Sequence, residues 1–284
     1  MAQMMEPSTT QNQRRHGPTE DHISTVCFRV TRACNLSCPY CQAPPNQKQL
    51  TLSELRRALC YFSQIGTERI KFTGGEPFIY HGMLQLIGEC RTAGMEPTVI
   101  TNGTTLPPGA IDCLRSYGAR MKISLHGPRE IHNAMQNKNA YDDVIATVRK
   151  LIAADIETSI HTMLHRGFNL NLRRWIEFLA SEGVHKVSFM TFIPRGRGSS
   201  MKEQWSFSIQ ELERLSEDVS ALATVYKQVI VVRHLDFARK RYLVFETSGS
   251  IVWELGDESN DSFVIQVPSG SFGTFAPGIA GVDP

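Results

Sequence analysis

The sequence predicts an α/β protein, a partial (βα)6 barrel similar to a TIM barrel, with a short β extension at the C-terminus. The first observation is that strand-like runs alternate with helix-like runs in about six units of roughly 30 residues, the period of parallel-sheet crossovers. The second is that about six units fall short of the eight that close a barrel, which favours an open one. The third is that chemically reactive residues follow predicted strand ends, where such barrels hold their active sites.

Each predicted strand is rich in β-branched and aromatic residues, and each predicted helix carries apolar residues at helical spacing. The first helix opens at Thr51 with Glu54 in its first turn, the pattern of a capping box. The second helix stops at Gly94. In chain order we expect strands at 24–31, 69–73, 97–103, 121–127, 157–164 and 185–192, and helices at 51–65, 81–94, 111–118, 141–155, 170–183 and 209–228.

Changes in composition divide the chain into three expected regions. Residues 1–20 are polar, lack the apolar stretch of a secretory signal and predict a disordered leader. Residues 21–228 are expected to form the barrel. Residues 229–284 are expected to form the extension, with a strand, a hairpin that turns at 248–250, and a Gly- and Pro-rich tail.

The overall composition excludes several classes of function. Hydrophobic residues make up 41% of the 284 residues and charged residues 20%, as in an ordinary globular protein. The net charge of only +2 gives no reason to expect nucleic acid or a membrane surface as a partner. No apolar run approaches the roughly 20 residues that span a bilayer. We therefore expect a cytoplasmic protein.

Three of the seven cysteines, Cys34, Cys38 and Cys41, fall within eight residues. Thiolates are soft ligands that select iron–sulfur clusters, zinc or copper(I). A structural zinc site needs four protein ligands, and no fourth Cys or His lies close by in the sequence. A cubane [4Fe–4S] cluster with three cysteine ligands leaves one iron open to bind a molecule that is not protein. A zinc site or a vestigial site is the alternative. The other four cysteines are isolated and expected to be structural: Cys27, Cys60, Cys90 and Cys113.

The spacing C-x3-C-x2-C, with Tyr40 just before the third cysteine, resembles the signature of the radical S-adenosylmethionine (radical SAM) superfamily. The resemblance extends over residues 24–228. It implies a [4Fe–4S] cluster on the three cysteines and SAM bound at the open iron. Reductive cleavage of SAM would then give methionine and a 5′-deoxyadenosyl radical. Tyr40 would lie against the adenine ring, or it would only pack the loop.

A second motif of the superfamily resembles residues 72–77, Phe-Thr-Gly-Gly-Glu-Pro. The resemblance implies that Gly74 and Gly75 give a ligand access to the backbone and that Glu76 bonds the amino group of SAM. Later strand ends of the family flank the ribose and the carboxylate. By position, they imply SAM contacts for Asn102, Ser124 and His126.

The subgroup most similar to this chain comprises the molybdenum-cofactor cyclase and the SPASM/twitch maturases. Those relatives usually carry further cysteines near the C-terminus for auxiliary clusters. Here no cysteine follows Cys113, and the hairpin region carries Glu246, Trp253 and Glu254 instead. An auxiliary cluster is therefore not expected, and the cyclisation that depends on one is in doubt.

Substrate contacts are expected from three residues at later strand ends. His161 lies on the fifth predicted strand, and Arg195 and Arg197 follow the sixth, in a loop able to bring two guanidinium groups to an anion. The alternatives are a structural histidine and a solvated basic loop.

The leading hypothesis is an enzyme that abstracts hydrogen from a small biosynthetic molecule such as a nucleotide, nucleoside or sugar. An electron donor such as flavodoxin or ferredoxin would be its protein partner. The first alternative is a peptide-modifying radical SAM maturase, which the short polar N-terminus disfavours because it has no recognisable peptide-docking domain. The second is a non-catalytic iron–sulfur protein, which the intact Gly-Gly-Glu-Pro turn disfavours.

Overall fold

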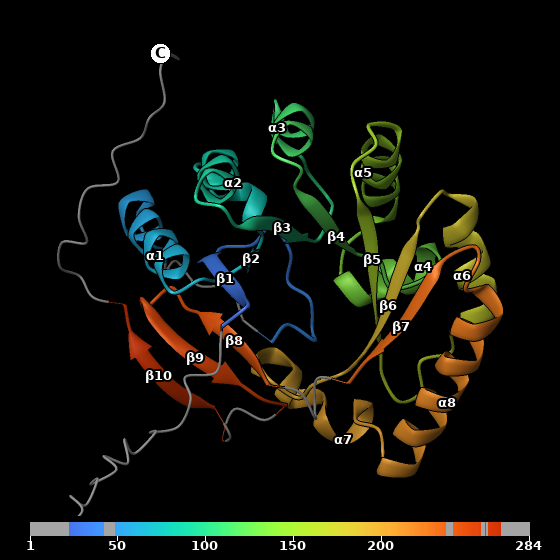
Figure 1. The fold of residues 1–284 in the computed structure, drawn as a ribbon. Coiled ribbons are helices and arrows are strands. Elements are labelled where there is room, and N and C mark those ends of the chain that lie inside the picture. Colours follow the sequence, from blue (N-terminus) through green and yellow to red (C-terminus); the bar gives the residue numbers. More distant parts are fainter. Residues whose placement is uncertain (1–22, 43–48, 237–240, 257–258, 260, 268–284) are drawn as a thin grey trace, which may run out of the picture.

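The computed structural model describes residues 23–42, 49–236, 241–256, 259 and 261–267. Its strands form one ten-stranded sheet in the order β10-β9-β8-β1-β2-β3-β4-β5-β6-β7, with helices along the outside of the curve (Figure 1). The strands are β1 (Thr25–Thr31), β2 (Arg69–Gly74), β3 (Glu96–Thr101), β4 (Arg120–Ser124), β5 (Thr158–Leu164), β6 (Lys186–Thr191), β7 (Val231–Leu235), β8 (Tyr242–Phe245), β9 (Ser250–Glu254) and β10 (Ser262–Gln266).

The helices lie between the strands in the expected alternation. They are α1 (Leu52–Gln64), α2 (Met83–Thr92), α3 (Ala110–Ser116), α4 (Arg129–Gln136), α5 (Tyr141–Ala153), α6 (Leu172–Ser181), α7 (Lys202–Trp205) and α8 (Ile209–Tyr226), with the short 3-10 turns η1 (Pro77–Ile79) and η2 (Gly196–Met201). Thr51 and Glu54 form the predicted capping box of α1. Among the helices of the described residues, none combines the length and apolar character needed to span a bilayer.

Strands β1 to β7 pair in chain order, and every pair is parallel. The predicted α/β class and parallel barrel sheet are therefore confirmed. The run of parallel strands from β1 is one strand longer than the sequence predicted, because β7 follows α8 and pairs with β6. The sequence had assigned these residues to the extension.

The two faces of the barrel sheet differ because side chains alternate along each strand. The outer face is apolar and packs against the helices. Val26, Phe28 and Val30 of β1 are all fully buried in the main core. The Phe28 ring contacts Phe62 of α1 and Phe72 of β2, with centroids 6.0 and 5.7 Å apart. The residues between them face the concave side.

The C-terminal strands extend the sheet beyond β1. β8 pairs with β1 in parallel, and β9 and β10 continue antiparallel. The predicted hairpin turn is present, with Gly249 at φ +80° and its N–H donating to the carbonyl of Glu246. Phe245 reaches the core, its ring centroid 4.6 Å from that of Phe28.

Helices α4 and α7, the 3-10 turns η1 and η2 and strand β10 were not predicted from the sequence. Helix α4 is short and polar and directly follows Gly127-Pro128. Strand β10 lies in a segment for which no strand was predicted. The predicted leader, 1–20, and the Gly- and Pro-rich tail lie outside the described residues.

Candidate active site

The cysteine loop lies directly against the end of β2. β1 ends at Thr31, and the loop that follows carries the three cysteines. The N–H of Gly75 donates to the carbonyl of Thr31, and the N–H of Glu76 donates to the carbonyl of Ala33, both at 2.8 Å. The two motifs that are some 40 residues apart in the sequence are thus joined by backbone hydrogen bonds at the carboxyl edge of the sheet.

Gly74 and Gly75 are required by this close approach. A Cβ atom on Gly74, whose φ is +148°, would lie 2.2 Å from the carbonyl oxygen of Thr31. A Cβ atom on Gly75 would lie 1.9 Å from that of Ala33. Neither contact is sterically possible, so a side chain at either position would push the cysteine loop away. The sequence had explained these glycines by access for a ligand, whereas the contacts found here are with the loop.

The carboxylate of Glu76 is fully buried and joins β2 to β3. One oxygen accepts from the N–H of Phe78 at 3.0 Å and from the hydroxyl of Thr101 at 2.7 Å, and the other accepts from the N–H of Asn102 at 2.8 Å. Burial raises the pKa of Glu76 to about 7, against the lowering effect of these donors. In this conformation the carboxylate faces protein donors from three residues rather than open space.

Asn102 continues this connection to the first cysteine. Its Nδ2 donates to the side-chain oxygen of Asn35 at 2.8 Å and lies 4.0 Å from the sulfur of Cys34. Its Oδ1 accepts from the N–H of Thr104 at 2.9 Å. The structure therefore brings Asn102 to the cysteine loop, and its contact with SAM stays a prediction.

Within the described residues, the three cysteines form no disulfide and lie half-buried on one loop. Burial raises the pKa of Cys34, and it raises that of Cys38 to about 12. Their charges act on one another, since ionised Cys41 and Cys34 each further raise the pKa of Cys38. Thiols bind iron or zinc as thiolates, so metal binding releases their protons to solvent.

Three soft ligands on one loop are the donor set expected of a [4Fe–4S] cluster, with a fourth position left to a molecule that is not protein. Within the described part of the chain, no group of three or more His, Cys, Asp or Glu residues is arranged to hold one metal ion.

Tyr40 and His126 form a hydrogen-bonded chain to the second cysteine. The Tyr40 hydroxyl hydrogen-bonds the sulfur of Cys38, and its oxygen lies 2.5 Å from Nε2 of His126. His126 is buried, and its Nδ1 accepts from the N–H of Met163 at 3.2 Å. The Tyr40 ring also packs against the small cluster of Met135, Met163 and Phe192. These contacts pack the loop, and a contact of Tyr40 with the adenine ring of SAM stays a prediction.

Ser124 and His161 are opposite each other in the register of β4 and β5, on the concave side of the sheet. His161 is only 6% exposed. Burial is the largest cause that lowers the pKa of His161, to about 3, and Lys122, Lys71 and Lys186 lower it further. The imidazole is therefore neutral at physiological pH.

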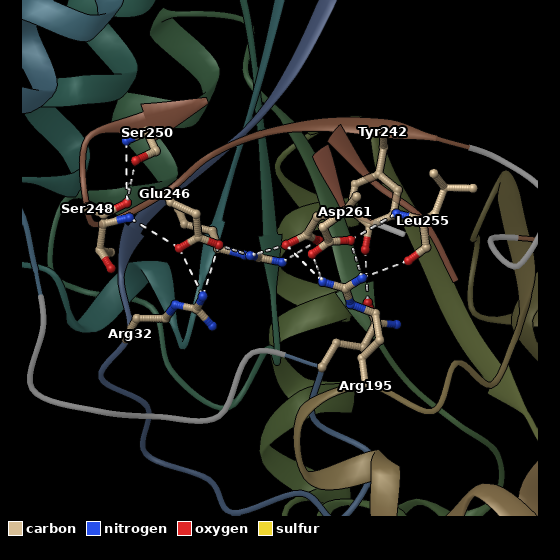
Figure 2. Close-up of polar contacts among 12 residues, drawn as sticks. Arg32, Arg195, Tyr242, Glu246, Ser248, Ser250, Leu255 and Asp261 are labelled. Carbon is tan, nitrogen blue, oxygen red and sulfur yellow. Dashed lines mark hydrogen bonds and ion pairs between the residues drawn. The ribbon is translucent and has the colours of Figure 1, made fainter. Parts of the chain in front are cut away.

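Arg195 is engaged by the C-terminal hairpin rather than open to a substrate (Figure 2). Its guanidinium donates to both oxygens of Asp261 at 2.6 Å and to the carbonyl of Leu255 at 2.8 Å, and it lies 3.5 Å from Glu254. Arg195 as a whole residue is 4% exposed. The predicted substrate contact did not anticipate these partners, which lie some 60 residues farther along the chain.

Arg195 belongs to an ion-pair network that the sequence did not predict. Arg29 donates to Glu254 through both terminal nitrogens, at 2.6 and 2.9 Å, and also pairs with Glu246. Arg32, two residues before Cys34, donates to both oxygens of Glu246 at 2.9 Å. The network connects β1, the cysteine loop and the loop after β6 through the hairpin (Figure 2).

Arg197 lies at the cysteine loop. Its N–H donates to the carbonyl of Cys41 at 2.9 Å, and its side-chain Nη1 is buried with no hydrogen-bond partner among the described residues. The second arginine of the predicted loop is therefore near the thiols.

A cavity of about 380 Å³ opens beside the end of β5. Its lining is mostly apolar and includes Leu164, His165, Phe168, Leu170, Phe207 and Leu215. None of the residues that line it belongs to the cysteine loop or the glycine turn.

Comparison with known proteins agrees with this geometry. The model of the Radical SAM superfamily matches residues 28–180, just over half of the chain. The chain is 26% identical over 222 residues to the GTP 3′,8-cyclase of Petrotoga mobilis, covering 74% of this chain and 68% of the cyclase. It is 29% identical over 203 residues to the AdoMet-dependent heme synthase of Nitratidesulfovibrio vulgaris, covering 66% of this chain and 55% of the synthase. It therefore spans about half to two thirds of the length of these relatives.

Two solved structures share the fold. SuiB of Streptococcus suis bound to S-adenosylmethionine superposes with a TM-score of 0.70 at 14% identity, over 86% of this chain and 63% of SuiB. The enzyme anSMEcpe with bound AdoMet gives the same TM-score and identity, over 86% of this chain and 78% of its own. Both confirm the barrel architecture. From the matching family model, the cysteine triad and the turn against which it packs, we conclude that the chain belongs to the radical SAM superfamily of enzymes.

Proposed function

We propose that this protein cleaves SAM reductively at a [4Fe–4S] cluster on Cys34, Cys38 and Cys41, and that the resulting radical abstracts hydrogen from a small biosynthetic substrate. The observation that carries the proposal is the pair of backbone hydrogen bonds that fasten the cysteine loop to the Gly-Gly-Glu turn. Cluster and SAM together would supply a one-electron cleavage of a carbon–sulfur bond. The protein's part is to bind, orient and exclude water.

In the Gly-Gly-Glu turn, the main chain and the Glu76 side chain have different roles in binding SAM. Gly74 and Gly75 keep the cysteine loop close, and the main chain around them is the surface offered to the amino group of SAM. The Glu76 carboxylate fixes that surface by holding Thr101 and Asn102. We assign Glu76 a positioning role, because its oxygens already accept three hydrogen bonds and its side chain is fully buried.

Other groups complete the proposed SAM site. Asn102 and Ser124 stand at the ends of β3 and β4, where polar side chains can meet ribose hydroxyls or a carboxylate. Arg197 offers a buried guanidinium nitrogen that lacks a partner in the described structure, which suits an anion. His126 holds Tyr40 and thereby the second cysteine. An electron donor such as flavodoxin or ferredoxin remains a prediction.

The test is SAM cleavage by the reconstituted protein. Protein with its cluster rebuilt without oxygen is mixed with SAM and dithionite, and 5′-deoxyadenosine is measured by chromatography. Formation of 5′-deoxyadenosine in the presence of cluster and reductant supports the proposal. If a protein with full iron content forms none, the non-catalytic iron–sulfur alternative is favoured instead.

A further inference from the structure

The concave face of the barrel sheet carries an unusual set of basic side chains. Lys71 of β2 lies between the buried residues Ile70 and Phe72, and Lys122 of β4 lies between Met121 and Ile123. Because neighbouring apolar residues face the helices, alternation directs both lysines to the concave side.

Two further cations lie on the same face. Lys122 is level with Ser159 of β5, which is level with Lys186 of β6. One row nearer the carboxyl edge, His161 is level with Ser188, which is level with Arg233 of β7. Four basic side chains and one buried histidine thus share the concave side of β2 and of β4 to β7.

None of these cations forms an ion pair with a carboxylate among the described residues, although the charge of Glu157 acts on Lys186 from a longer distance. No hydrogen bond or ion pair joins Lys71, Lys122, Lys186 or Arg233 to an acidic side chain in that part of the chain. The carboxylates nearest to this face are already bound to arginines. Glu246 and Glu254 are held in the network described above, and Glu157 accepts from Arg120 at 2.9 Å.

The electrostatic effect of this crowding is visible at Lys122. Burial lowers its pKa to about 8, and Lys71, Lys186 and Arg233 contribute to the lowering. Half-buried like charges without partners cost folding free energy, and proteins rarely keep them without a compensating charge. An anion on this face would supply that charge.

His161 of β5 lies on the same face as these cations. The residue is 6% exposed, and no hydrogen bond from the described residues reaches either ring nitrogen. Neither nitrogen is among the fully buried polar atoms without a partner, so the ring keeps accessible hydrogen-bonding capacity for a ligand on this face. Its neutral ring can donate one hydrogen bond and accept another.

We propose that the concave face binds an anionic group of the substrate, a phosphate ester or a carboxylate, between Lys71, Lys122, Lys186 and Arg233, with His161 as a hydrogen-bond partner. This inference rests on the proposed function and adds the substrate class to it. Lys122 lies two residues before the end of β4, so the anion would sit about 7 Å below the cysteine edge. The reacting part of the substrate would then extend toward that edge.

The experiment is calorimetric titration of the cluster-loaded protein at low salt, with inorganic phosphate and succinate as separate probes. We expect at least one probe to bind, and Lys71→Met and Lys122→Met each to weaken it about tenfold or more, as expected for a lost charged hydrogen bond. Lys122→Arg, which keeps the charge, should retain most of the affinity. The control is Lys150→Met on the exposed side of α5, which should bind like wild type.

Each outcome has a fixed meaning. Binding of phosphate alone, succinate alone or both identifies the anion class, provided that the two methionine variants lose it. Absence of binding by either probe, or equal binding by wild type and Lys122→Met, overturns the inference. The titration needs neither SAM nor reductant, so its failure is distinct from a failure to cleave SAM. A melting temperature for Lys122→Met at or above that of wild type shows that the variant folds and that the removed charge was uncompensated. A lower one shows that Lys122 has a partner in the fold, which contradicts the inference.

Discussion

The hydroxyl oxygen of Tyr40 lies 2.5 Å from Nε2 of His126, and this contact determines which of the two groups donates the hydrogen bond. Nδ1 of His126 accepts from the N–H of Met163, so the proton of the neutral ring is on Nε2, and Nε2 donates to Tyr40. Tyr40 is then free to donate its own proton to the sulfur of Cys38. A backbone group of β5 is thus connected to a proposed cluster ligand through two side chains.

Tyr40→Phe should lower the reduction potential of the rebuilt cluster by some tens of millivolts, while iron content stays unchanged. Hydrogen bonds to ligand sulfurs stabilise the more negative, reduced cluster, and this variant removes one of them. The measurement is a redox titration followed by the EPR signal of the reduced cluster. Tyr61→Phe, on α1 and away from the thiols, is the matched control. Equal potentials for Tyr40→Phe and wild type would mean that the hydroxyl does not donate to Cys38 in the loaded protein.

Glu76→Gln should destabilise the protein by about 1–3 kcal/mol, the cost of leaving a buried donor without its acceptor. An amide places an NH₂ group where one carboxylate oxygen now accepts, opposite the N–H of Asn102 or that of Phe78. Chemical denaturation measures the change. Glu130→Gln, at an exposed position in α4, should leave the free energy of unfolding nearly unaltered. If the Glu76 variant were as stable as this control, the positioning role assigned to the Glu76 carboxylate would be wrong.

The same residue predicts a pH dependence of stability. Burial raises the folded-state pKa of Glu76 to about 7, above its ordinary value of 4.5, so the folded protein holds this proton more tightly than the unfolded chain does. The contribution to stability is fully present below about pH 4.5 and is lost as the pH rises through about 7. Comparing wild type with Glu76→Gln from pH 5 to 8 isolates it, because the variant lacks the titrating group. A stability difference between the two that does not change with pH would contradict the assignment.

Arg195→Gln should cost about 3 kcal/mol and loosen the C-terminal strands, because it leaves Asp261 without its partner and leaves Glu254 with Arg29 alone. Relative to wild type, amide hydrogen exchange should become faster in β9 and β10 and stay the same in β4. Arg149→Gln also removes an arginine–glutamate pair, but Arg149 is 63% exposed, so its loss should cost less than about 1 kcal/mol. Similar losses of unfolding free energy in both variants would show that the buried ion-pair network stabilises the fold no more than a surface pair does.

The sequence was sufficient for those parts of the molecule that depend on local pattern. Alternating strands and helices, the capping box at Thr51 and the turn at Gly249 are signals within a few residues, and each lies where it was expected. The cysteine spacing and the Gly-Gly-Glu-Pro turn also identify the family, since both motifs are local.

The rest depended on contacts between distant segments. Neither the partners of Arg195 nor the parallel pairing of β7 with β6 can be read from nearby residues. The burial of Glu76 follows from the position of β3, which a motif does not contain. For the lysines a signal was present and was missed. Lys71 and Lys122 each stand between two apolar residues of their strand, and alternation then directs the lysine to the face opposite to theirs.

If Cys34, Cys38 and Cys41 hold a cluster that cleaves SAM, iron and 5′-deoxyadenosine should disappear together when one of them is removed. Both are measured in wild type, Cys38→Ala and Cys113→Ala. Wild type and Cys113→Ala should each carry about four irons per chain and form 5′-deoxyadenosine from SAM and dithionite. Cys38→Ala should lose the cluster absorbance and all cleavage while its circular dichroism remains that of the folded barrel. Cleavage retained in Cys38→Ala, or stoichiometric zinc in place of iron in wild type, would contradict the claim.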